Sequence, residues 1–288
     1  MVNALSYIVS ETRLHDRDRF LCSIFAPKGV REGLFTVLAF NIEISKTREM
    51  VRENIIGEIR LQWWRDTIEH IFNNPSRIRL NHLVADELAT VIEKFSLSRS
   101  FFDMLIDSRS RDLVDTPLED EADLRRYTYE TSSTLSQILL EILCPVDKVL
   151  SSSEVKAVES IGMAWALTGI LRASTTLAKQ KRILIPKTLM EEFEFNNDEF
   201  YGQTATNGIL KATAYIVDLA RAEIAYARRL LKGNVKRRYL ALFLQASLAE
   251  MYLNKIESER FNPFSPKIEA GRTWRQLKIA IMAACGSF

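Results

Sequence analysis

Apolar residues recur every three or four positions along most of the chain, a spacing that predicts amphipathic α-helices. The alternating pattern of β-strands never extends beyond a few residues. Since no linker, repeat or low-complexity tract interrupts the pattern, we expect one all-α domain of about ten helices over residues 1–288. The expected helices cover residues 4–24, 31–42, 57–71, 80–95, 98–108, 124–142, 151–171, 217–231, 239–251 and 272–284.

In the helix expected at residues 57–71, the spacing places Ile59, Trp63 and Ile68 toward the core. Trp63 and Trp64 are adjacent, so we expect one of them in the core and the other at a groove. Residues 191–203 are predicted to be a polar connection.

The stretch Gly162–Pro186 combines a buried helix with a basic loop. Its apolar positions at helical spacing are Met163, Ala164, Leu167, Ile170 and Leu171. The chain then becomes basic at Lys179, Lys181 and Arg182. An apolar helix that opens into a basic loop indicates an anion site at the mouth of an apolar cavity. No pair of carboxylates lies at this end of the helix, so it offers no ligands for a divalent metal.

Composition narrows the class of protein. Of the 288 residues 47% are hydrophobic, and ten Gly and seven Pro are few for the length, which favours helices. The net charge of +2 gives no support for nucleic-acid binding. We see no signal or transit peptide, and the longest apolar run, residues 161–171, is too short to span a bilayer. These features lead us to expect a cytoplasmic protein, with peripheral membrane contact left open.

Four blocks of the chain resemble, in order, the squalene/phytoene synthase family. The stretch Gly162–Pro186 keeps the frame of the family's central helix, and Arg60–Asp66 (RLQWWRD) matches its RLxWWRxxL motif. Arg31–Glu49 and Tyr127–Ser136 match two further family blocks, and together the blocks cover about residues 15 to 270. The resemblance implies an isoprenoid-synthase-type helical bundle around a central cavity. Active members join two prenyl diphosphates head to head and hold Mg²⁺ through two Asp-rich motifs.

All but one of the acids of the two motifs are missing here. The three acids of the first motif fall on Ser45, Lys46 and Glu49, and the two Asp of the second fall on Ala173 and Leu177. A methyl, an aliphatic chain and an ammonium group cannot ligate Mg²⁺, which prefers carboxylate oxygens. We therefore expect no metal and no catalytic residue.

Carboxylates elsewhere in the chain could replace the missing Mg²⁺ ligands. Asp103 and Asp107 have i, i+4 spacing, and Asp112 aligns with a family acid, but we interpret all three as solvated, on an acidic face and loop. Glu43 is interpreted as the partner of an arginine.

Basic side chains remain at the predicted mouth, and cations can hold a phosphate without metal. The candidate phosphate-binding residues are Lys46, Arg48, Arg172, Lys179, Lys181 and Arg182. The alternative is that they are ordinary solvated charges paired with Glu49 or Glu53. The candidate cavity-lining residues are Tyr127, Ser133, Ala166 and Gly169.

One branch of the family shows the same loss of acids. Ala39–Glu43, Ser132–Leu135 and Leu171–Ser174 resemble the respiratory complex I assembly factor branch more closely than the active synthases. This resemblance implies a non-catalytic assembly factor that binds a protein, a prenyl lipid or a phospholipid. It also implies a location in the cytoplasm of a bacterium or, for a processed eukaryotic relative, in the mitochondrial matrix. Two alternatives stay open: a prenyltransferase with atypical Mg²⁺ ligands and a prenyl-lipid carrier.

Overall fold

The computed structural model describes residues 4–51, 53–73, 80–114, 116–144, 150–231 and 237–286. Regular structure in these ranges is entirely helical, which confirms the all-α prediction. The first helices are α1 (Ala4–His15), α2 (Arg17–Ser23), α3 (Lys28–Ser45), α4 (Thr47–Met50), α5 (Asn54–Asn73), α6 (Leu83–Phe95) and α7 (Arg99–Leu113).

The middle of the chain adds α8 (Glu121–Thr128), the π-helical turn η1 (Tyr129–Ser133), α9 (Thr134–Leu143), α10 (Ser152–Arg172), α11 (Ser174–Lys179), α12 (Lys187–Glu192) and α13 (Asn197–Tyr201). The last part adds α14 (Asn207–Leu231), the 3₁₀ turns η2 (Arg237–Tyr239) and η3 (Pro266–Glu269), α15 (Leu240–Ser258) and α16 (Arg272–Cys285).

The described ranges hold more helices than the ten predicted, because some predicted elements are divided. The helix expected at residues 4–24 breaks at Asp16, whose carboxylate caps α2 by accepting a hydrogen bond from the Arg19 backbone N–H at 3.4 Å. The helix expected at 124–142 contains η1. The predicted polar connection at 191–203 was wrong in part, since it contains α13.

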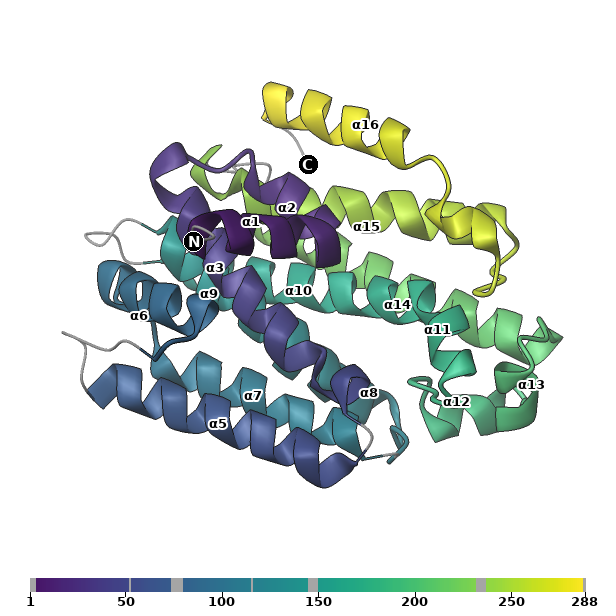
Figure 1. The fold of residues 1–288 in the computed structure, drawn as a ribbon. Coiled ribbons are helices and arrows are strands. Elements are labelled where there is room, and N and C mark those ends of the chain that lie inside the picture. Colours follow the sequence, from purple (N-terminus) through teal and green to yellow (C-terminus); the bar gives the residue numbers. More distant parts are fainter. Residues whose placement is uncertain are drawn as a thin grey trace.

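Helix α10 runs through the middle of the molecule (Figure 1) and packs against α14, α15, α9 and η1. It begins at a capping box, in which Ser151 and Glu154 satisfy each other's backbone N–H groups, as the serines at its start predicted. Gly162 allows η1 to approach closely, because a Cβ there would lie 2.5 Å from Ser133 Cα. Helix α10 ends at Arg172, and the chain bends at Ala173 into α11. The sequence predicted the anion site at this end of α10.

The predicted orientation of α5 was right for Ile68 and wrong for Ile59 and Trp63. Ile59 and Trp63 point outward, with 64% and 40% of their surface exposed, whereas Leu61, Trp64 and Ile68 are buried. Trp64 packs edge-on against Phe40 of α3, with ring centroids 5.0 Å apart. The helix carries two apolar stripes, and the stripe that faces α7 is the buried one.

Candidate functional site

The first motif region lies at the end of α3. Ser45 is the last residue of α3, and its Oγ donates a hydrogen bond to the Ile42 carbonyl at 3.2 Å. Lys46 forms the junction with α4, and Glu49 is exposed on α4. The single remaining acid of the motif therefore points to solvent.

The second motif region lies where α10 meets α11. Ala173 forms the kink between the two helices, and Leu177 is buried, as a core residue is. Neither side chain carries an oxygen atom. In the part of the chain that the structure describes, no group of three or more His, Cys, Asp or Glu side chains could hold a metal ion. The residues at the motif positions do not fit Mg²⁺, whereas the absence of any metal cofactor stays a prediction.

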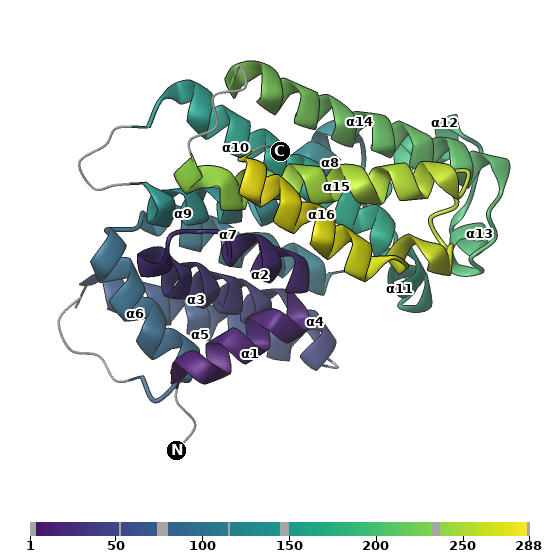
Figure 2. The same ribbon diagram turned by 90° about the horizontal axis from the view of Figure 1, so that it is seen from above.

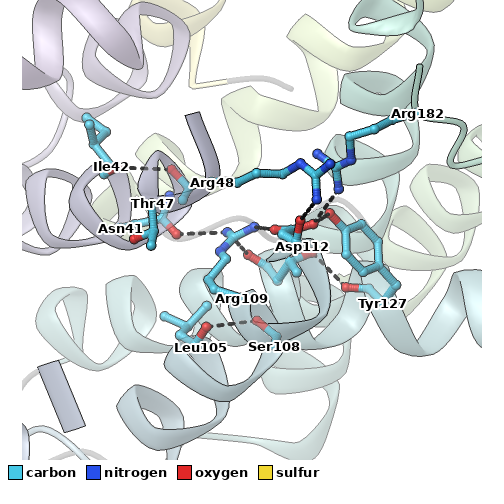
Figure 3. Close-up of polar contacts among 12 residues, drawn as sticks. Asn41, Ile42, Thr47, Arg48, Leu105, Ser108, Arg109, Asp112, Tyr127 and Arg182 are labelled. Carbon is cyan, nitrogen blue, oxygen red and sulfur yellow. Dashed lines mark hydrogen bonds and ion pairs between the residues drawn. The ribbon is translucent and has the colours of Figure 1, made fainter. Parts of the chain in front are cut away.

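Asp112 is the centre of a buried ionic cluster between α7, α8 and the loop after α11 (Figure 3). Its carboxylate accepts hydrogen bonds from Arg109 Nη1 (3.2 Å), Arg182 Nη2 (3.2 Å) and the Tyr127 hydroxyl (2.9 Å). Arg48 donates to its backbone carbonyl at 2.7 Å. The prediction that Asp112 lies in a solvated loop was wrong, because Asp112 belongs to α7 and is only 8% exposed.

The cluster extends from Asp112 to α3 through Arg109. Arg109 Nη2 donates to the Asn41 side-chain oxygen at 3.2 Å, while its Nε is buried with no hydrogen-bond partner. Burial, and next the negative charge of Asp112, raise the pKa of Tyr127 far above its usual value. Tyr127 is therefore neutral at physiological pH and acts as a donor. Three of the about four acceptor sites of the Asp112 carboxylate are thus engaged by protein groups.

A pocket of about 150 Å³ lies beside this cluster, and Asp112, Tyr127, Lys181 and Arg182 are among its lining residues. Arg111 also lines it, and the Arg111 guanidinium pairs with Asp123 through two hydrogen bonds. Two of the six candidate phosphate-binding residues, Lys181 and Arg182, thus meet at one pocket, with Arg48 bound to Asp112 nearby.

Arg172 belongs to a different cluster. It forms ion pairs with Asp18 (3.1 Å) and Glu269 (2.8 Å), and its guanidinium lies 3.6 Å from the centroid of the Tyr252 ring. Burial alone would lower the pKa of Arg172, but the hydrogen bond to Glu269 and the nearby charges raise it overall. Lys179 is exposed at the end of α11, and Lys46 is half-buried at the α3–α4 junction. The expected pairing of the cations with Glu49 or Glu53 is absent from the described contacts of Arg172 and Arg182.

The candidate cavity-lining residues also lie in different places in the structure. Tyr127 lines the pocket beside Asp112, and the side of α10 at Gly169 faces open space. Ala166 is half-buried on α10. Ser133 is instead fully buried in the contact with α10, where its Oγ donates to the Glu159 carbonyl at 2.6 Å.

Sequence reasoning missed Arg19, which extends from α2 into the interior. Arg19 donates hydrogen bonds to the side chains of Ser132 (3.0 Å) and Gln245 (3.3 Å), and its guanidinium lies 5.6 Å from the Trp165 ring centroid. The amphipathic pattern around Arg19 gives no sign of this. Polar contacts therefore join η1, α15 and α10 in the interior.

The interpretations of the other carboxylates are confirmed. Asp107 is exposed and pairs with Arg65 (2.8 Å). Asp103 is half-buried with a side chain that is 40% exposed, and it pairs with Arg99 (3.2 Å). Glu43 lies 3.7 Å from Arg60, as expected for an arginine partner. Both residues line a groove with Trp63, the exposed member of the tryptophan pair, which confirms that one tryptophan lies in the core and the other at a groove.

The chain belongs to the squalene/phytoene synthase family, whose sequence pattern matches residues 12–278. It is similar to complex I assembly factor 6 of Bos taurus, with 26% identity over 278 residues that cover 96% of this chain and 81% of that protein. It is also similar to presqualene diphosphate synthase of Rhodopseudomonas palustris, with 25% identity over 73% of each chain.

Among solved structures, squalene synthase from Alicyclobacillus acidocaldarius matches with a TM-score of 0.78 and 21% identity, over 91% of this chain and 95% of that one. This likeness confirms the isoprenoid-synthase-type helical fold. Fold alone does not separate synthases from non-catalytic members, so the side chains at the site decide between them.

Proposed function

We propose that this chain is a non-catalytic member of the squalene/phytoene synthase family that assists the assembly of respiratory complex I. The observation that carries the proposal is the chemistry at the two motif regions, where Lys46, Ala173 and Leu177 stand in place of acids. A diphosphate leaving group needs a cation to stabilise it, and Mg²⁺ needs oxygen ligands that these side chains lack.

The state of Asp112 supports the same proposal. Asp112 is the carboxylate best placed to compensate for the lost acids, but Arg109, Arg182 and Tyr127 already engage it. Freeing it for a metal would leave two arginines and a phenol without their acceptor, and breaking a buried ion pair costs about 3–5 kcal/mol. The similarity to complex I assembly factor 6 spans nearly the whole chain and agrees with a non-enzymatic role.

An exposed apolar stripe on α5 supports a protein partner. Ile55, Ile59 and Trp63 follow one another at four-residue spacing and are all exposed, and Ile56 lies beside them. Glu58 and Arg60, both half-buried beside the stripe, carry charges of opposite sign, and an apolar centre with a polar rim is typical of a protein-binding surface. We expect a subunit or intermediate of the complex to bind here.

The enzymatic alternative is tested by incubating the purified chain with farnesyl or geranylgeranyl diphosphate and Mg²⁺. We expect no C30 or C40 product above that of heat-denatured protein. A squalene synthase with intact Asp-rich motifs, assayed in the same buffer, is the positive control. Formation of head-to-head product at a rate that scales with the amount of folded chain would refute the non-catalytic proposal.

The assembly role is tested by deleting the gene in its own host and measuring assembled complex I on native gels. We expect less assembled complex, with recovery on expression of the wild-type chain. The double variant Ile55→Asp/Ile59→Asp should fail to restore it, because charges on the stripe disrupt an apolar contact. Tyr226→Asp, at an exposed aromatic residue of α14, is the matched control and should restore assembly. Normal assembly in the deletion strain would contradict the role.

A further inference from the structure

Helix α16 carries apolar side chains on two faces. Ile279 and Ala283 are buried on the side that packs against α15. On the outer side Trp274, Leu277 and Ile281 are 61%, 50% and 53% exposed. Their spacing of three and four residues places them in one stripe along the helix. Neither the core nor the described neighbours of α16 explain this outer stripe.

The helix lies at an outer edge of the molecule, with α15 beneath it (Figure 1), and in the view from above it crosses in front of α15 (Figure 2). Its outer stripe therefore faces away from the rest of the protein. A helix of 14 residues is about 21 Å long, so the stripe can lie flat against a surface. In the part of the chain that the structure describes, no helix has the length and apolarity to cross a membrane.

The charge of this helix selects its partner. Residues 272–285 include Arg272, Arg275 and Lys278 and no Asp or Glu. Arg275 is only 7% exposed, whereas Lys278 is exposed next to the outer stripe. A groove of about 340 Å³ runs between α15 and α16, where Met251, Ala270 and Trp274 provide apolar lining and Lys255, Arg275 and Lys278 provide cations. Lys255 is paired with Glu259 at 2.7 Å, and Arg275 donates to the Glu269 carbonyl. Lys278 lies 5.8 Å from the centroid of the Trp274 ring.

We propose that the outer face of α16 binds the surface of a membrane that contains anionic phospholipids. An amphipathic helix with Trp and aliphatic residues on one face and only cations among its charges is typical of interfacial binding. The apolar side chains enter the boundary between headgroups and acyl chains, and Lys278 meets lipid phosphate. The groove beside Trp274 accepts part of a lipid, since apolar atoms and cations both line it. A membrane accounts for the apolar stripe and the positive charge together.

The test uses the full chain and flotation with vesicles of phosphatidylcholine, with or without phosphatidylglycerol. We expect wild type to float with the anionic vesicles, and less as salt increases. The double variant Trp274→Ala/Lys278→Glu should lower the partition coefficient at least about tenfold, because it removes apolar contact and reverses one surface charge. Both residues are exposed, so circular dichroism should show unchanged folding.

The chain offers a matched control in α14, where Arg229 lies 5.8 Å from the ring centroid of exposed Tyr226, as Lys278 does from Trp274. Tyr226→Ala/Arg229→Glu removes an equivalent aromatic–cation pair from another face and should change vesicle binding less than about twofold. Equal losses in both variants, or no binding of wild type, would overturn the proposal. So would a dimer in solution that the α16 variant dissociates, because a second copy would then cover the stripe. The result does not depend on the assembly assay, so either proposal can fail alone.

Discussion

Arg182 donates a hydrogen bond from Nη2 to Asp112 Oδ1 at 3.2 Å and joins the loop after α11 to the last turn of α7. The two residues are 70 positions apart in sequence, and Arg109 binds the other oxygen of the same carboxylate. In this protein the acid that aligns with a family acid serves as the centre of an internal ionic cluster (Figure 3).

If Asp112 is structural, Asp112→Ala should lower the free energy of unfolding by about 3–5 kcal/mol, because buried Arg109 and half-buried Arg182 lose their counter-charge. Asp107→Ala is the matched control on the same helix. It removes an exposed partner of Arg65 and should cost less than about 1 kcal/mol. Denaturant unfolding of both variants measures the difference. Equal, small losses would show that the cluster contributes little to stability.

The sequence was sufficient to predict the helical class and the central helix. Local signals determine these features, namely the 3.6-residue period, the serines that cap α10 and the low content of Gly and Pro. The solvated carboxylates Asp103 and Asp107 were also predicted correctly, because such residues are exposed in most environments.

Features set by tertiary contacts were missed. Helix α5 has two apolar stripes, one through Ile59 and Trp63 and one through Leu61 and Trp64, and only packing against α7 decides between them. The burial of Asp112 depends on Arg182, which local sequence around either residue does not indicate. The six cations predicted as one phosphate-binding set do not lie together, because contacts between residues distant in sequence place them. Arg172, for example, pairs with Asp18 and Glu269.

Restoring an acid at the buried position of the second motif region should destabilise the protein. Leu177→Asp places a carboxylate at a buried position and should lower the free energy of unfolding by at least about 2 kcal/mol. Ala173→Asp is the control, because Ala173 is half-buried and precedes α11 as its N-cap, where Asp is favourable. It should cost less than about 1 kcal/mol by thermal or denaturant unfolding. A fully stable Leu177→Asp variant would mean that the core adjusts easily at this site.

The loss of folding stability at acidic pH should depend on Asp123. The hydrogen bonds from Arg111 are the main cause that lowers the pKa of Asp123 below its usual value of 3.8. A carboxyl group with a lowered folded-state pKa contributes stability above its unfolded-state pKa, and this is lost as pH falls through the folded-state pKa. The free energy of unfolding should therefore decrease below about pH 4, and less steeply in Asp123→Asn.

Arg111→Gln should flatten the same acid-dependent decrease, because it removes the cause of the lowered pKa and leaves Asp123 in place. The measurement is denaturant unfolding at a series of pH values for wild type and both variants. An unchanged slope in both variants would assign the acid sensitivity to other carboxylates.

Two glycines of α10 should respond in opposite directions to the same substitution. A Cβ at Gly162 would lie 2.5 Å from Ser133 Cα and 2.9 Å from Ser133 N, and this backbone of η1 has no flexible side chain to move aside. At Gly169 a Cβ meets no atom within 4 Å. Gly162→Ala should therefore lower the free energy of unfolding by about 1–3 kcal/mol through overpacking. Gly169→Ala should raise it by about 0.5–1 kcal/mol, because Ala is the better helix former. Destabilisation by both substitutions would show that the open space at Gly169 closes in solution.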